Sequence, residues 1–552
     1  MDKLRRVVGG TVISLLGQGM TWTSTLLLTI AYGRFLGASQ FGELYFALSF
    51  AMLIGFPLEF GFNQQITRDV AQDQGKALSY LSNALLLKVL FWLILYVFAL
   101  LFSHVMGYST EQSNLIAICG LTLLSSSIAT TFASLHYGLG NVVFPVIGTI
   151  LEKGLSALFG YLVLKFGGNV QQMALVLLGG SLVSALWQAL CFYRKVGLGF
   201  TLDKALIRDL LRTSIPFIVS GAIGVIYYRI DTVLLQLLTS TTVVGWYGAS
   251  YRLFDTLIFL PSLIINPIMA PIYADLSLAS LDKLKVAVEK SLNFLLFCVL
   301  PIATALLVAA PNIIGVLYHN PEFQHTTPAL QALAPGLVFL YVNTVLVSVI
   351  ISLRREKRMT ISASIALVFN LALNFFLIPH LQHVGAALAT SLTEFLLVCV
   401  SLCFVPREIL SFHSLVVASK AFLASMVMAL VIWILRNTSI YVLLPAGAIT
   451  YLAVAFLIRT IPTEDLRMLL TALRHKAERV ETTPEIAPVE EVMFELEETT
   501  LPRITAITRP LRRTNPLPER TEIDEEVTRP RIPALRSEPR RRRDTLGLEV
   551  DL

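Results

Sequence analysis

About fourteen apolar runs, separated by short polar segments, occupy the first 460 residues of this 552-residue sequence. A helix rises about 1.5 Å per residue, so about 20 apolar residues cross the roughly 30 Å of hydrocarbon in a bilayer. Hydrophobic residues make up 55% of the chain and charged residues only 14%, as expected where most helices face lipid. The sequence therefore predicts an all-α polytopic membrane protein with spans near residues 7–31, 43–61, 80–103, 114–136, 143–165, 173–193, 213–237, 244–270, 291–311, 328–352, 360–378, 384–404, 415–436 and 441–460.

The basic residues at the ends of these runs predict the orientation of the chain. If the N-terminus is cytoplasmic, nineteen Lys and Arg residues near the ends of spans fall on the cytoplasmic side, and only Arg34, Lys165 and Arg436 fall on the other. Cytoplasmic loops carry an excess of Lys and Arg, and one missed span would invert the bias for every later loop. We therefore expect a multi-pass protein of the inner (cytoplasmic) membrane with both termini in the cytoplasm.

A basic segment at residues 194–212 divides the first six runs from the next six. Two halves with an even number of spans share one orientation, so a repeat between them would be parallel. Gly42 and Gly245 occupy matching places at the start of the second span of each half, and Asn63 and Asn266 each follow 21 residues later. We expect two pseudo-symmetric six-helix lobes (1–193 and 213–404), a cytoplasmic linker (194–212) and two further helices (405–460).

Residues 461–552 have a different composition, rich in Glu, Pro, Thr and Arg. Such a segment cannot bury enough apolar surface to offset the entropy of ordering, so we expect a mostly disordered cytoplasmic tail. Its first part, 464–480, has the pattern of a short amphipathic helix on the membrane surface. The tail is either a dispensable solvated segment or a docking site for partner proteins or anionic lipid.

Charged residues inside the apolar runs are the first indication of function. A charge near the bilayer centre costs about 2.5–3.5 kcal/mol on insertion scales, so it persists where it faces a partner or a watery cavity. Arg252 and Asp255 are three residues apart, hence on one helix face, which Ser262 and Asn266 continue. We expect this face to line a polar pathway, and a structural ion pair is the alternative.

The preceding run contains a second pair, Arg229 and Asp231. Residues two apart point in nearly opposite directions from a regular helix, so both cannot face one cavity. Asp231 continues the line of Gly224 and Tyr227 and is the better candidate for the cavity. Arg229 is expected to bind a neighbouring helix or to reach the interface.

Four further charges within predicted spans are candidates for function. Glu152 and Lys153 fall at the middle of the fifth span and Glu394 near the middle of the twelfth, too far from either surface for an acid to reach water easily. Glu394 is expected to couple an ion or gate a pathway, or else to be a structural acid. Lys88 lies nearer the cytoplasmic side and extends either to the interface or into a cavity.

Signatures of soluble enzymes and of metal sites do not occur in the sequence. There is no GxxxxGK[ST], HExxH or GxSxG motif, and the five cysteines lie in or at the ends of apolar runs without CxxC or Cys/His spacing. We expect no enzymatic activity, cofactor, metal, disulfide or nucleic-acid binding. Without an ATP site, transport would use an ion gradient or facilitated flipping.

Four segments of the two halves are typical of one family: GRFLGASQFGELYFALSF at 33–50, GFNQQITRDVAQ at 61–72, SIPFIVSGAIGVIYYRIDTVLL at 214–235 and VGWYGASYRLFDTLIFLP at 244–261. They resemble the multidrug/oligosaccharidyl-lipid/polysaccharide exporter (MOP) superfamily, and within it the Wzx-type flippases of oligosaccharides and polysaccharides. The resemblance covers about residues 1–460. It implies two six-helix lobes with two appended helices, alternating access by rocking, and a cationic cavity for a polyprenyl-pyrophosphate-linked oligosaccharide.

A pyrophosphate cannot cross hydrocarbon unaided and needs guanidinium or ammonium donors in a wet cleft. With the resemblance, the expected substrate-binding residues are Arg252, Lys153, Arg34 at the outer mouth, Lys88 and Arg229. The residues expected to couple H⁺ or Na⁺, or to gate, are Asp255, Asp231, Glu394 and Glu152. The implied function is to flip the sugar lipid to the outer leaflet for the synthesis of cell-surface polysaccharide. We expect the transport unit to be a monomer, and polysaccharide-assembly proteins to be partners of the tail.

Three alternatives stay open at this point. A drug or cation antiporter of the same fold would have a cavity dominated by acids, and the first span here contains none. A lipid II flippase would differ only in its sugar cargo. A membrane scaffold would act through its tail without transport.

Overall fold

Long helices account for nearly all of the secondary structure in the computed structural model of this protein. The structure describes residues 2–59, 61–197, 199–258, 260–261, 265 and 269–460, without the side chains of 2–12, 14–16 and 216–220. These residues contain no β-strand. The tail predicted at 461–552, and Ser262 and Asn266 of the predicted polar face, lie outside them.

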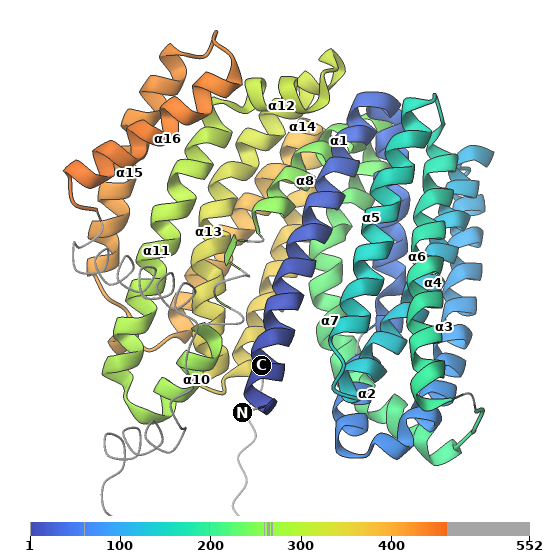
Figure 1. The fold of residues 1–552 in the computed structure, drawn as a ribbon. Coiled ribbons are helices and arrows are strands. Elements are labelled where there is room, and N and C mark those ends of the chain that lie inside the picture. The colour runs from blue at the N-terminus through green and yellow to red at the C-terminus, as the bar shows by residue number, and fades with distance from the viewer. Residues whose placement is uncertain are drawn as a thin grey trace, which may run out of the picture. The chain divides into compact units, whose positions relative to one another are not determined.

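The first part of the chain forms a bundle that is shown in blue to green in Figure 1. Hydroxyl and amide side chains cap several of its helices: Ser109 accepts a hydrogen bond from the amide of Gln112 (3.2 Å), and Asn169 and Gln172 form a reciprocal capping box. The helices are α1 (Asp2–Glu59), α2 (Phe62–Gln72), α3 (Ala77–Val105), α4 (Thr110–Gly138), α5 (Val143–Lys165) and α6 (Val170–Val196).

The second part forms another bundle, which α7 and α8 join to the first. The helices are α7 (Lys204–Leu238), α8 (Thr241–Leu257), α10 (Ala270–Ala279), α11 (Leu281–Val308), α12 (Ala310–Tyr318), α13 (Thr327–Ser352) and α14 (Glu356–Phe404), with the 3-10 helix η3 (Pro321–Thr326) before α13. The last two helices, α15 (His413–Ile434) and α16 (Ile440–Leu457), pack beside α11 at the edge of this bundle (Figure 1).

Eleven of the described helices are long and apolar enough to cross a membrane, which confirms the all-α polytopic fold. Two of them, α1 and α14, each contain one non-helical residue where the sequence predicted a loop between spans: Gly37 (φ 74°) and Gln382 (φ 50°). The eighth predicted span, 244–270, is divided between α8 and α10 by a segment that is only partly described. The count of fourteen spans and the lobe boundaries stay predictions.

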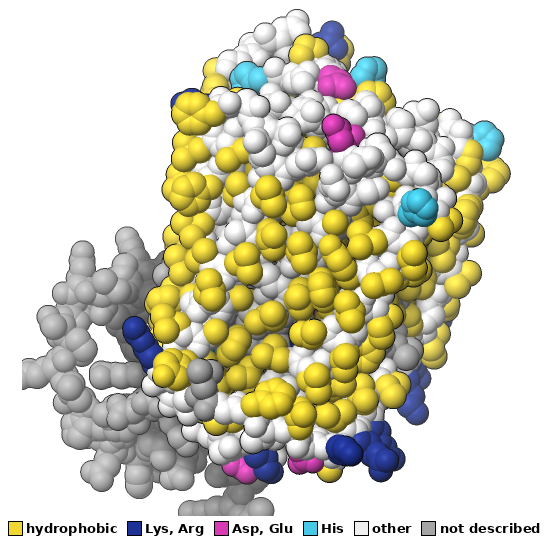
Figure 2. Space-filling model, turned by 90° about the vertical axis from the view of Figure 1, so that its right-hand side faces the viewer, with side chains coloured by type: hydrophobic (Ala, Val, Ile, Leu, Met, Phe, Trp, Pro, Cys, Tyr) yellow, Lys and Arg dark blue, Asp and Glu magenta, His cyan; other side chains and the backbone are white. Residues whose placement is uncertain are grey.

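Apolar side chains cover the sides of the described unit. Figure 2 shows a broad field of them across the middle of one face, with most of the visible Lys and Arg side chains at its lower edge. On α3, Leu93, Ile94 and Leu101 are each at least half exposed. So much exposed apolar surface suits lipid rather than water, in agreement with a multi-pass membrane protein.

We call the end of the helices that carries α2 and α10 the inner end, and the end that carries α12 and the Gly37 break the outer end (Figure 1). The inner end holds Arg68, Lys204 and Arg208. It is therefore the end that the distribution of basic residues predicts to be cytoplasmic.

Candidate functional site

Two adjoining cavities lie where the first bundle meets α7 and α8. The larger, of about 520 Å³, is lined mainly by α1, α4 and α5, with Arg229 from α7 and Arg252 from α8. The smaller, of about 350 Å³, lies between α1, α5, α7 and α8. Thr25, Lys153 and Arg252 line both. The structure thus brings charged residues from both halves of the chain to one place.

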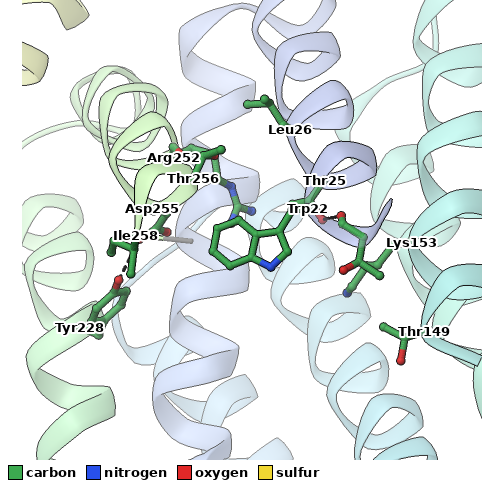
Figure 3. A pocket seen from close by; sticks show the side chains of 11 residues that line it. Trp22, Thr25, Leu26, Thr149, Lys153, Tyr228, Arg252, Asp255, Thr256 and Ile258 are labelled. Carbon is green, nitrogen blue, oxygen red and sulfur yellow. Dashed lines mark hydrogen bonds between the residues drawn. The ribbon is translucent and has the colours of Figure 1, made fainter. Parts of the chain in front are cut away.

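Arg252 projects from α8 into the smaller cavity, toward the indole ring of Trp22 on α1 (Figure 3). Among the described residues, its guanidinium has no hydrogen bond and no acid within 4 Å. A guanidinium carries five N–H donors and is permanently charged. Arg252 therefore offers this cavity a cation whose donors are available to an anionic group.

Lys153 lies on the other side of Trp22, on α5 (Figure 3). Its ammonium binds the neighbouring carboxylate of Glu152 at 2.6 Å, and its side chain is 43% exposed. An ion pair in contact with water contributes little net energy and exchanges readily, so Lys153 can turn from Glu152 to a bound anion. Glu152 lines the larger cavity, and Lys153 lines both.

Arg229 and Asp255 form a loose pair between α7 and α8, with 3.9 Å between Nη2 and Oδ2. Tyr228 donates its hydroxyl to the other oxygen of Asp255 at 3.1 Å. Arg229 also reaches across to α1, where Nη1 approaches the hydroxyl oxygen of Tyr45 (3.4 Å) and Nε approaches the sulfur of Met52 (3.4 Å). Both charges are mostly buried, and Arg229 links the two bundles.

The two cavities are not cationic as a whole. Their lining contains three bases, and also the three acids Glu59, Glu152 and Asp255. Lys153 and Arg229 each have an acid within 4 Å, whereas Arg252 has none among the described residues, so Arg252 is the base of the lining that is least neutralised by direct contact. The cationic cavity expected from the sequence is thus a local cationic site in a charge-balanced cavity.

Asp231 and Glu394 line neither cavity. Asp231 accepts a hydrogen bond from the Tyr247 hydroxyl on α8 and one from the amide of Thr232 (2.7 Å). Glu394 on α14 accepts one from the Tyr227 hydroxyl at 2.8 Å. Both carboxylates are buried, so they are internal groups of the second bundle.

Asp231, which we expected to face the cavity, lines neither cavity, whereas Arg229 both lines the larger cavity and contacts the neighbouring helix α1. Arg229 faces the larger cavity and Asp231 faces the interior of the second bundle. The two do point in different directions, as their spacing requires. On this side of α7, Tyr227 contacts Glu394 of α14 and Asp231 contacts Tyr247 of α8.

Lys88 and Arg34 also lie outside the lining of both cavities. The side chain of Lys88 is fully buried in the first bundle, where its ammonium donates to Asn63 Oδ1 (3.0 Å) and to the carbonyl oxygen of Ser127 (3.3 Å). Arg34 lies at the outer end, and its guanidinium donates to the carbonyl oxygens of Val316 (3.0 Å) and Leu317 (2.7 Å) at the end of α12. A basic side chain suits a helix C-terminus because the last carbonyls there lack intrahelical partners.

At the outer end, α1 and α8 pack backbone to backbone. A Cβ atom at Gly42 would lie 1.8 Å from the carbonyl oxygen of Thr241, and one at Gly245 would lie 1.9 Å from that of Ala38. Only glycine permits such an approach. Glu322 of η3 supports this contact, since its Oε2 accepts from the amide of Ala38 at 3.0 Å, next to the break at Gly37. These contacts hold α1 and α8 together at the outer end.

The larger cavity extends toward the inner end as far as Glu59, a residue that our sequence reasoning did not assign to a site. Glu59 accepts from Asn63 Nδ2 at 2.8 Å and from the hydroxyl of Thr130 at 3.0 Å. Trp22, Tyr45 and Tyr228 were missed as well. The only signal for Glu59 was an acid near the end of an apolar run, and nothing in the sequence paired it with Thr130.

Comparison with known proteins agrees with the sequence and the fold. The family model described as "Polysaccharide biosynthesis protein" matches residues 7–276. The chain is 21% identical over 397 residues to a Haloferax volcanii protein named "Probable low-salt glycan biosynthesis flippase Agl15", an alignment that covers 71% of this chain and 81% of the relative. It is 24% identical over 278 residues to the "Uncharacterized membrane protein MJ1068" of Methanocaldococcus jannaschii, covering 49% and 54% of the two chains.

Solved structures share the fold. The structure titled "Lipid II flippase MurJ, inward closed conformation" aligns with a TM-score of 0.68 at 15% identity, covering 82% of this chain and 99% of the other. An inward-facing multidrug resistance MATE family transporter of the MOP superfamily aligns with a TM-score of 0.57 at 16% identity, covering 71% and 96%. The resemblance drawn from the four sequence segments is confirmed by these likenesses.

Proposed function

We propose that this member of the multidrug/oligosaccharidyl-lipid/polysaccharide exporter superfamily is a flippase, which carries a polyprenyl-pyrophosphate-linked oligosaccharide from the cytoplasmic to the outer leaflet by alternating access. The observation that carries the proposal is the position of Arg252, whose guanidinium enters the smaller cavity and has no acid within 4 Å among the residues that the structure describes. The family match and the relative named as a probable glycan flippase support the same substrate class.

The arrangement around Arg252 suits a pyrophosphate. Guanidinium groups bind phosphate oxygens through parallel N–H donors, and these charge-assisted hydrogen bonds are stronger than neutral ones. Lys153 faces the same space from α5 and adds a second donor once it leaves Glu152. The two bases come from opposite bundles, so a bound pyrophosphate would contact both halves of the protein at once.

The contacts at the two ends suggest how transport would proceed. At the outer end α1 and α8 are in backbone contact at Gly42 and Gly245, while the larger cavity reaches inward to Glu59. This arrangement suits loading from the cytoplasmic leaflet. Rocking of the bundles would then separate α1 from α8 and release the headgroup outward.

Two buried acids are suited to coupling by H⁺ or Na⁺. Each of Asp231 and Glu394 accepts from a tyrosine hydroxyl and has no base bound within 4 Å among the described residues. A buried carboxylate without a base is costly unless a cation or a proton neutralises it. We propose that neutralisation of these acids by H⁺ or Na⁺ accompanies one step of the transport cycle. We also propose that the protein works as a monomer in the inner membrane, with both termini in the cytoplasm.

The proposal is tested by reconstituting the full chain in liposomes and measuring flipping of a fluorescent undecaprenyl-pyrophosphate-linked oligosaccharide. We expect Arg252→Ala and Lys153→Ala to lower the flipping rate at least tenfold at equal protein level. Lys165→Ala is the matched control, because Lys165 is an exposed base at the end of the same α5. Wild-type rates in both cavity variants would overturn the assignment of an anionic substrate, and no flipping by wild-type protein would favour a non-transporting scaffold.

A cation exporter is the second candidate, and the three acids of the lining favour it. The same preparation distinguishes the two through binding of tetraphenylphosphonium. An exporter of cations should bind this probe more tightly after Arg252→Ala, because a repelling charge has been removed. The flippase proposal expects no binding by either protein.

A further inference from the structure

A separate polar region occupies the inner part of the larger cavity, away from Arg252. Thr122, Ser126 and Thr130 line it from α4 at spacings of four residues, hence from one helix face. Glu59, at the end of α1, lies opposite this face of α4 and accepts a hydrogen bond from the hydroxyl of Thr130. The cavity therefore ends in hydroxyl groups and one carboxylate.

The carboxylate of Glu59 is held in place by a chain of polar contacts. Lys88 donates to Asn63 Oδ1 at 3.0 Å, and Asn63 Nδ2 donates to Glu59 Oε2 at 2.8 Å. The Lys88 ammonium is buried and, in the part of the chain that the structure describes, has no acid within 4 Å. The amide of Asn63 thus bridges the Lys88 ammonium and the Glu59 carboxylate. These hydrogen bonds fix the orientation of the carboxylate, and the nearby charge of Lys88 balances the charge of Glu59.

Glu59 has hydrogen-bonding capacity left for a ligand. A carboxylate has about four acceptor sites, and among the described residues the Asn63 amide and the Thr130 hydroxyl are the groups that donate to it. Thr122 donates to the carbonyl oxygen of Ile118 at 3.0 Å, so the oxygen of its hydroxyl can still accept. The region offers fixed acceptors, which is what vicinal hydroxyl donors require.

We infer that the inner part of the larger cavity, formed by Glu59, Thr122, Ser126 and Thr130, is a carbohydrate-binding subsite in which Glu59 accepts hydrogen bonds from sugar hydroxyls. The inference rests on the proposed function, since it places the sugar of the substrate whose pyrophosphate binds Arg252.

The two ends of the cavity suit the two parts of such a molecule. A carboxylate repels a pyrophosphate, whereas a neutral polyol binds to it through charge-assisted hydrogen bonds. On α1, Met52 contacts Arg229, and Glu59 lies seven residues further on, about 10 Å along the helix. The separation leaves room for sugar units between the basic region and Glu59.

The experiment compares two probes on the purified full chain in lipid nanodiscs: undecaprenyl pyrophosphate, and a panel of its derivatives carrying glucose, galactose or N-acetylglucosamine. We expect wild-type protein to bind at least one sugar-bearing probe about tenfold more tightly than the bare pyrophosphate. Glu59→Gln and Thr130→Val should each reduce this preference to less than threefold and leave the affinity for the bare probe within twofold. Thr130→Ser should restore the preference.

Glu43→Gln is the matched control, because Glu43 is another acid of α1 that lines neither cavity. Thr130→Val provides a second test if Glu59→Gln does not fold, as judged by gel filtration. The inference is overturned if wild-type protein binds bare and sugar-bearing probes equally, or if both variants keep the full preference. Failure of wild-type protein to bind either probe would instead overturn the proposed function.

Discussion

The hydroxyl oxygens of Ser39 on α1 and Thr241 on α8 lie 3.2 Å apart at the outer end, where they join the two bundles. Cysteines at these positions would place their Cβ atoms within reach of a disulfide. We expect Ser39→Cys/Thr241→Cys, in a background without the five native cysteines, to oxidise to a species that no longer flips lipid, and reduction to restore flipping. Each single variant should be insensitive to oxidant. Undiminished flipping by the fully oxidised double variant would show that the outer end need not open.

The glycine contact beside this pair gives a second prediction. A methyl group at Gly42 would meet the carbonyl oxygen of Thr241 at 1.8 Å, so Gly42→Ala must separate α1 from α8. Overpacking of this kind costs about 1–3 kcal/mol, which should lower the thermal midpoint of the purified protein and raise the labelling rate of a cysteine placed at Ser39. Gly179→Ala is the control, since nothing lies within 4 Å of the added atom. Equal labelling in both variants would contradict a close contact of α1 and α8.

Most helix positions could be predicted because an apolar run of about 20 residues is long enough to cross a membrane as a helix. The span expected at 143–165 is α5 (Val143–Lys165), and the one expected at 80–103 lies within α3. The short helices α2 and α12 were not foreseen, because neither is long enough to be apolar over a membrane width. Gly42 and Gly245, which were paired as repeat positions in the sequence, prove to be in contact with each other.

The site was predictable only in part. A charged residue is rare within an apolar span and is therefore easily identified, but the sequence does not show which way its side chain points. Arg252 and Lys153 were found in this way and line the cavities. The direction of Arg229 depends on Tyr45 and Met52, which approach it from α1, and no local pattern records such a contact. The hydrogen bonds from Lys88 through Asn63 to Glu59 likewise join α3 to the end of α1 and the start of α2, a contact that no local pattern predicts.

Arg229 and Asp255 should be energetically coupled despite their separation of 3.9 Å. Arg229→Ala removes the nearest base from Asp255 and leaves the Tyr228 hydroxyl as its hydrogen-bond partner among the described residues, at a cost of about 1–3 kcal/mol for a buried charged group that has lost a partner. Asp255→Asn removes that remaining charge. A double-mutant cycle on the free energy of unfolding in detergent should therefore give a coupling of about 0.5–3 kcal/mol, with the double variant more stable than the sum of the single losses predicts. Strict additivity would mean that the two charges do not interact.

The burial of Lys88 gives the last prediction. Lys88→Met removes both hydrogen bonds that the ammonium donates. It also removes the positive charge that lies near the carboxylate of Glu59, on the other side of Asn63. We expect a loss of about 1–3 kcal/mol in unfolding free energy, since a buried polar group left without its partner carries a penalty of that size. Adding Glu59→Gln should recover part of the loss, because no uncompensated charge then stays in the bundle. Lys204→Met, at an exposed position, should change stability by less than about 0.5 kcal/mol. If the double variant is less stable than Lys88→Met alone, Lys88 does not balance the charge of Glu59.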